Sequence, residues 1–150
     1  MLATALTGFI ILCFIQFVNV SASWYNSIEA WNNRGIAFRN KGELDRAIED
    51  FTQAINLDPN WAELRYNRGT AYLYKDNFDM AIEDFTQAIL KDTYLAKAWY
   101  SRGNAYLYID DLARATNDHM QAIALNPYYV LTLKKQDHIY LSESIFQKWK

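Results

Sequence analysis

Hydrophobic and small side chains recur along the chain at spacings that predict pairs of helices. Trp31, Gly35 and Phe38 lie one and two helical turns apart, so they share one face of a helix. The stretch 44–55 has the same periodicity, with apolar or small residues at 44, 47, 48, 51, 54 and 55. Gly42 lies between the two stretches and predicts the turn that joins them.

This two-helix pattern occurs three times, with a period of 34 residues. Gly35 recurs as Gly69 and Gly103, and each of these glycines follows an arginine. The second half, residues 44–55, recurs at 78–89 and more weakly at 112–123, and Asp76 and Asp110 replace Gly42 in the turns. A fixed period of this length predicts stacked copies of one supersecondary unit.

The repeated unit resembles the tetratricopeptide repeat, a 34-residue pair of helices with an aromatic, Gly, Tyr, Ala, Phe, Ala and Pro pattern. The first copy matches this pattern at Trp31, Gly35, Phe38, Ala47, Phe51, Ala54 and Pro59. Departures include Arg34, Arg68 and Arg102 in place of Leu, and His119 in place of Phe. The resemblance implies an all-α solenoid of three repeats, over 28–61, 62–95 and 96–127, and a C-terminal capping helix over 128–150. The alternative for 128–150 is that Phe146 and Trp149 stay exposed and pair with another chain.

Residues 1–22 are predicted to form an N-terminal hydrophobic helix that is separate from the repeats. The segment from Leu2 to Val18 carries no charged side chain. Its length is at the low end of what is needed to cross a bilayer. Small residues at 21–23 are compatible with cleavage of a signal peptide, whereas the absence of basic residues before the segment favours an uncleaved membrane anchor. A buried accessory helix and a mistaken start site remain as further alternatives. Residues 23–27 are a short linker, and the protein is expected to be membrane-associated or exported.

The sequence contains no pattern that predicts catalysis. It has two histidines and one cysteine, too few and too far apart for a metal site, and no phosphate-binding loop or nucleophile motif. A net charge of −2 argues against nucleic acid as a partner. We therefore expect a protein that is not an enzyme, with no cofactor and no metal. His119 is interpreted as a core residue.

The repeated arginines have two interpretations. Asp50, Asp84 and Asp118 each follow an arginine by the same interval, so the arginines are predicted to form ion pairs between the two helices of a repeat. The alternative is a ladder of arginines that binds an acidic ligand.

The family resemblance also implies a binding surface, because the first helices of tetratricopeptide repeats line a concave groove. The predicted peptide-binding residues are rich in Tyr and Asn, which combine apolar area with hydrogen-bonding groups. They are Asn33, Tyr66, Asn67, Tyr74, Lys97, Tyr100, Asn104 and Tyr108. The expected partner is a peptide or protein segment, and the alternative function is self-association into homo-oligomers through the ends of the stack.

Members of the family that bind chaperone tails hold a terminal carboxylate with a defined set of five side chains. Asn67 and Lys97 match that set, whereas Asn32, Ile36 and Ser101 do not. The sequence therefore does not predict binding to heat-shock chaperone tails.

Overall fold

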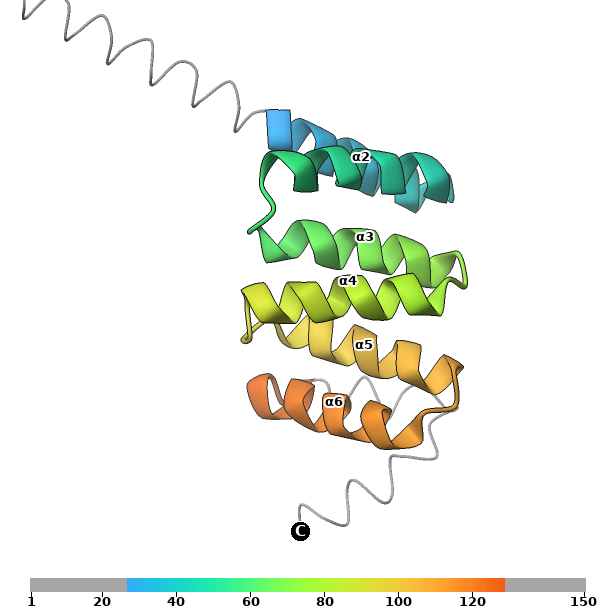
Figure 1. The fold of residues 1–150 in the computed structure, drawn as a ribbon, viewed down its shortest axis with the longest axis vertical. Coiled ribbons are helices and arrows are strands. Elements are labelled where there is room, and N and C mark those ends of the chain that lie inside the picture. Colours follow the sequence, from blue (N-terminus) through green and yellow to red (C-terminus); the bar gives the residue numbers. More distant parts are fainter. Residues whose placement is uncertain (1–26, 129–150) are drawn as a thin grey trace, which may run out of the picture.

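The computed structural model describes residues 27–128, which form a stack of antiparallel helices (Figure 1). The elements in chain order are a helix over 27–40, α2 (Leu44–Leu57), α3 (Ala62–Tyr74), α4 (Phe78–Lys91), α5 (Ala96–Tyr108) and α6 (Leu112–Leu125). From α2 onward each helix packs on the next, and α3 also contacts α5. The first helices of the repeats are therefore neighbours, as the repeat pattern predicts.

The turns within the repeats are built by residues that tolerate the left-handed backbone region. Gly42, Asp76 and Asp110 have φ values of 79°, 58° and 60°, and Asp is among the non-glycine residues that adopt this conformation most readily. Asn77 and Asp111 then accept a hydrogen bond from a backbone N–H in the first turn of α4 and α6. These turns confirm the position of the predicted breaks at 42, 76 and 110.

The connections between repeats are each stabilised by a hydrogen bond from the backbone to an Asp or Asn side chain. The side chains of Asp58, Asp92 and Asn126 each accept a hydrogen bond from the backbone N–H two residues later, at 2.9, 2.9 and 3.1 Å. This local bond bends the chain after the second helix. Because the side chain of Asp92 makes the turn, the middle repeat forms the same connection with Thr93 where the other repeats have proline.

Each repeat buries a ring against the glycine of its first helix. A Cβ atom at Gly35 would lie 2.7 Å from Phe51, and one at Gly69 would lie 2.9 Å from Phe85. In the third repeat the ring that meets Gly103 belongs to His119, which is fully buried. The repeated glycines therefore have the packing role that the sequence predicts, and His119 is a core residue.

Among residues 27–128, no helix is long and apolar enough to cross a membrane. The predicted signal peptide or anchor over 1–22 and nearly all of the predicted capping helix over 128–150 lie outside the described residues. Both stay predictions.

Candidate functional site

The three repeated arginines are engaged inside the repeats. Arg68 donates from Nε and Nη2 to the two carboxylate oxygens of Asp84, at 2.7 and 2.8 Å. Equivalent bidentate pairs join Arg34 to Asp50, at 2.6 and 2.7 Å, and Arg102 to Asp118, at 2.7 and 2.9 Å. The aspartates are buried, so these pairs confirm the predicted bridges between helices and leave no ladder of free guanidinium groups.

Two of these arginines also connect one repeat to the previous one. Arg68 donates to the hydroxyl of Thr52 at 3.0 Å, and Arg102 donates to that of Thr86 at 2.9 Å. Hydrogen bonding to Asp84 raises the pKa of Arg68 further above its usual value, so this guanidinium stays charged. The arginines therefore stabilise the solenoid through contacts within the protein, and the candidate binding surface lies elsewhere.

Tyr66 and Tyr100 occupy equivalent positions on α3 and α5, and both are half-buried. The Tyr66 ring lies 5.9 Å from Phe85, and the Tyr100 ring lies 5.4 Å from His119. Burial raises the pKa of the Tyr100 hydroxyl, so it remains a neutral hydrogen-bonding group. Each tyrosine thus rests on the core ring of its own repeat and keeps part of its surface accessible on adjacent first helices.

A charged pair links the same two helices. Lys97 on α5 forms an ion pair with Glu63 on α3, and its ammonium group lies 4.5 Å from the centre of the Tyr66 ring. A cation at this distance from an aromatic face is attracted by the ring quadrupole. Lys97 is therefore committed to contacts within the protein, and the two charges cancel at this end of the surface.

Asn67 is buried and Asn104 is half-buried, and both side chains are hydrogen-bonded within the protein. The Asn67 side chain is buried, donates to Asn32 Oδ1 at 2.9 Å and accepts a longer bond from Arg39 at 3.4 Å. Asn104 Oδ1 lies 3.0 Å from His119 Nε2. Both asparagines therefore hold neighbouring elements together in this structure.

The remaining predicted residues are more accessible. Asn33 is exposed on the helix over 27–40, and Tyr74 and Tyr108 are 64% and 66% exposed at the carboxyl ends of α3 and α5. Tyr108 lies eight residues after Tyr100, a separation of about 12 Å along a helix. The structure thus groups Tyr66, Lys97 and Tyr100, and places Tyr74 and Tyr108 at the far end of the same helices.

Sequence reasoning did not single out Glu63, which neutralises Lys97. Glu63 and Lys97 occupy the same position in consecutive repeats. Opposite charges at equivalent positions were therefore the sequence feature from which this ion pair could have been predicted. Within residues 27–128 no group of His, Cys, Asp and Glu side chains is arranged to hold a metal ion.

Comparison with known families agrees with this geometry. Tetratricopeptide repeat models match residues 28–60, 62–92 and 96–129. The chain belongs to the tetratricopeptide repeat family. No curated protein matches the sequence significantly.

Similar solved structures include two complexes with peptides. The second repeat domain of Spaghetti (RPAP3) bound to an HSP90 peptide is 34% identical, with a TM-score of 0.66, and the match covers 70% of this chain and 99% of that one. The second repeat domain of human RPAP3 in complex with an HSP70 peptide is 35% identical, with a TM-score of 0.67 and coverage of 69% and 87%. The repeat domain of Arabidopsis OM64 is 26% identical, with a TM-score of 0.69 and coverage of 83% and 98%.

Proposed function

We propose that this protein is a non-enzymatic scaffold that holds a peptide or a protein segment on its first helices. The observation that carries the proposal is the arrangement of Tyr66 and Tyr100, two half-buried rings at equivalent positions on adjacent helices. Aromatic rings that are already fixed lose little side-chain entropy on binding and often supply most of the binding energy. Similar domains in complex with peptides support the same kind of function.

The bound segment is proposed to lie across repeats 2 and 3 in an extended or helical conformation. The rings of Tyr66 and Tyr100 offer apolar area, and their hydroxyl groups offer hydrogen bonds. Tyr74 and Tyr108 extend the surface toward the carboxyl ends of α3 and α5. Repeat 1 presents Asn32, which is bonded to Asn67, and therefore contributes less to this proposed surface.

The peptides bound by the similar domains are not carried over to this chain. Asn67 and Lys97 match the carboxylate-binding set of the family, but Asn67 is bonded to Asn32 and Lys97 is paired with Glu63. An acidic tail would have to displace Glu63 before it met a free ammonium group. A segment without a terminal acidic cluster is the better fit to the proposed surface.

The test is selection of peptides from a random library on the full chain, followed by affinity measurement for the selected sequences. Replacing both Tyr66 and Tyr100 with alanine is expected to weaken binding at least about 30-fold, since each lost ring costs about 1 kcal/mol or more. The matched control replaces Tyr94 and Tyr128, two exposed tyrosines in the connections that follow α4 and α6. Equal losses in the two double variants would contradict the proposal.

We also propose that residues 1–22 direct the protein to a membrane or out of the cell. The uncharged segment from Leu2 to Val18 is the support for this proposal. Amino-terminal sequencing of the natural protein separates the two routes. A first residue at Ser23 indicates a cleaved signal peptide, whereas an intact start indicates an anchor or a cytosolic protein.

A further inference from the structure

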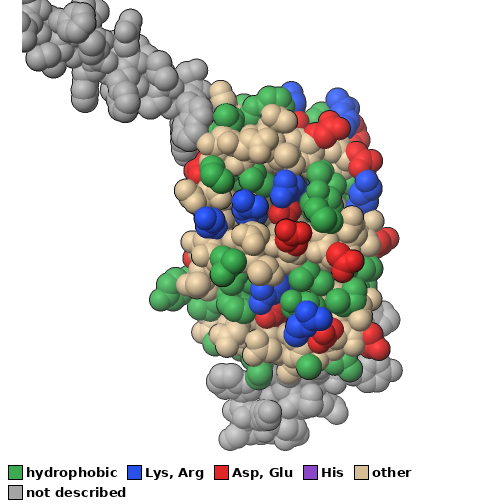
Figure 2. All heavy atoms as spheres, viewed as in Figure 1, with side chains coloured by type: hydrophobic (Ala, Val, Ile, Leu, Met, Phe, Trp, Pro, Cys, Tyr) green, Lys and Arg blue, Asp and Glu red, His purple; other side chains and the backbone are tan. Residues whose placement is uncertain are grey.

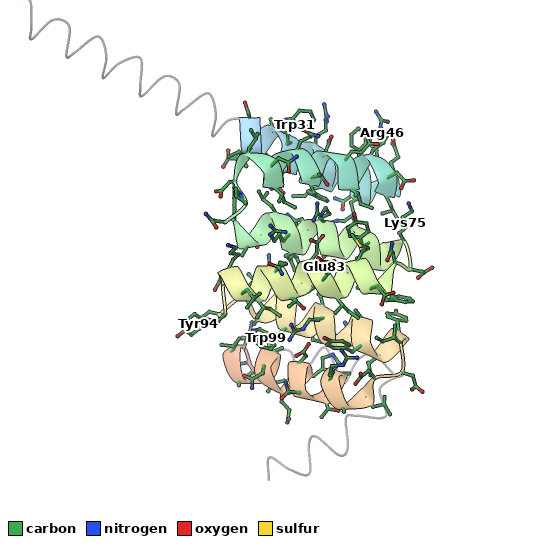
Figure 3. All side chains as sticks on the ribbon, viewed as in Figure 1. Trp31, Arg46, Lys75, Glu83, Tyr94 and Trp99 are labelled. Carbon is green, nitrogen blue, oxygen red and sulfur yellow. The ribbon has the colours of Figure 1, made fainter. Side chains whose placement is uncertain are left out.

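An exposed apolar surface lies along the edge formed by the turns within repeats 2 and 3. We define this turn-edge patch by six residues that lie in or beside these two turns. They are Tyr74, Phe78, Met80, Tyr108, Ile109 and Leu112. Ile109 is 40% exposed and Leu112 is 55% exposed, although both are large aliphatic residues. Lys75 marks this edge in Figure 3, and Tyr94 marks the opposite edge of the stack.

The turn-edge patch is held in shape by contacts between the two repeats. The rings of Phe78 at the start of α4 and Tyr108 at the end of α5 are stacked, with centroids 4.9 Å apart and an interplanar angle of 6°. The turn residues Asp76 and Asp110 fix the backbone on either side through their positive φ values. The patch is therefore a preformed surface, and its ordering costs little when a partner binds.

The first repeat lacks this apolar character. Its residues at the positions of Tyr108, Ile109 and Met80 are Asn40, Lys41 and Arg46. Arg46 also covers Phe38, with its guanidinium 4.0 Å from the ring centre. The patch is thus confined to repeats 2 and 3.

The border of the turn-edge patch carries negative charge. Among the described residues, Asp76, Asp79 and Asp110 take part in no ion pair. Within repeats 2 and 3, the cations of this edge are already committed, because Lys75 pairs with Asp45 and Arg114 pairs with Asp111. Figure 2 shows acidic side chains beside hydrophobic ones along this edge of the stack. The patch therefore combines apolar area with unbalanced carboxylates.

We infer that the turn-edge patch is a second docking surface and that it takes a basic amphipathic segment of a partner protein. Contiguous exposed apolar surface marks interaction sites on soluble domains. The unpaired carboxylates select lysine and arginine on the polar side of the incoming segment and repel acidic ones. Tyr74 and Tyr108 border both surfaces, but the inference goes beyond the proposed groove because the patch is built on four residues of the turns and second helices that the groove does not use. They are Phe78, Met80, Ile109 and Leu112.

The test uses the purified full chain and a labelled amphipathic helical peptide of leucine and lysine, with fluorescence anisotropy as the readout. A peptide of the same pattern with glutamate in place of lysine is the probe for charge. The lysine peptide is expected to bind at least about tenfold more tightly than the glutamate peptide, and its affinity is expected to fall with added salt. Equal binding of both peptides would overturn the inference.

Two matched pairs of variants then locate the site. I109S/L112S is expected to weaken binding of the lysine peptide about tenfold, while L90S/Y94S, which removes exposed apolar residues outside the patch, leaves it within about twofold. D76N/D110N keeps residues that tolerate positive φ and is expected to weaken binding about threefold, whereas E49Q/E83Q removes the same charge elsewhere without effect. Loss in the control variants equal to that in the patch variants would overturn the assignment.

Self-association is the other possible use of an apolar edge. Light scattering of the wild type and of I109S/L112S distinguishes it from binding of a partner protein. A concentration-dependent mass in the wild type that is absent in I109S/L112S would show that a second copy covers the patch, and would overturn the inference. Folding of each variant is checked by its thermal melt, and D76N/D110N serves as the second test if I109S/L112S is unstable.

Discussion

Arg68 and Asp84 form a bidentate ion pair between α3 and α4, and the same guanidinium donates a hydrogen bond to Thr52 in the preceding repeat. The carboxylate is only 4% exposed on its side chain and the arginine only 16%. One side chain therefore ties together the two helices of a repeat and two successive repeats.

Replacing Asp84 with Asn is expected to destabilise the protein by about 3 kcal/mol, because it leaves the Arg68 charge buried without its counterion. Asp50→Asn in the first repeat is the comparison and is expected to cost less, since the Arg34 side chain is 56% exposed and water can solvate its charge. Chemical denaturation of both variants checks the difference. A smaller loss for the Asp84 variant than for the Asp50 variant would contradict the role of the buried pair.

His119 is expected to make stability depend on pH. Burial lowers its pKa to about 4, against an ordinary value of 6.5, so the unfolded chain binds a proton between these values while the folded chain does not. Stability from this residue is fully present above pH 6.5 and is lost as the pH falls toward 4. The loss amounts to about 3 kcal/mol.

His119→Phe provides the matched variant, because the equivalent residues Phe51 and Phe85 fill the same place against a glycine. Denaturation curves between pH 4 and 7.5 are expected to show a flatter pH dependence for the phenylalanine variant. Parallel curves for the two proteins would contradict burial of a neutral histidine.

Gly69 is expected to be intolerant of larger side chains, because the Phe85 ring occupies the space that a Cβ atom would need. Gly69→Leu should cost about 1–3 kcal/mol, the usual cost of overpacking. Combining Gly69→Ala with Phe85→Leu tests the contact itself, since a smaller side chain at position 85 leaves room for the methyl group added at position 69. The double variant is expected to lose less stability than the sum of the two single variants. Strict additivity would mean that the two residues do not meet.

The turns offer a stabilising change. Asp110 adopts φ 60°, which an L-residue reaches at some cost and glycine reaches freely. Asp110→Gly is expected to raise stability by about 0.5–1 kcal/mol, and Asp76→Gly to do the same. Thermal melts measure the effect. A lower melting temperature in both variants would show that the carboxylates themselves stabilise these turns.

Much of the fold could be predicted from the sequence because one repeat determines its own internal contacts. The spacing of Arg68 and Asp84 predicts their pair, and the recurrence of Gly69 predicts a close helix contact. Contacts between repeats were harder to predict, since they depend on the angle at which one repeat stacks on the next. The bond from Arg68 to Thr52 depends on that stacking angle.

The candidate site illustrates the same limit. The family pattern places Asn67 among the groove residues, but the structure buries its side chain against Asn32 of the preceding repeat. Lys97 was also predicted to face a ligand, but the structure pairs it with Glu63, because α3 and α5 lie side by side. Residue type and position predict the helix face on which a side chain lies. Contacts with neighbouring repeats then determine whether that side chain is available to a ligand.

The most direct test of the central claim is an NMR titration of the isotope-labelled full chain with a peptide selected for binding. The proposal predicts that the backbone amides of α3 and α5 around Tyr66 and Tyr100, and the side-chain amide of Asn104, shift as the peptide is added. Signals from exposed Glu49 and Glu83 on α2 and α4 should stay in place. Shifts confined to α2, α4 and α6, with α3 and α5 unperturbed, would contradict a binding surface on the first helices.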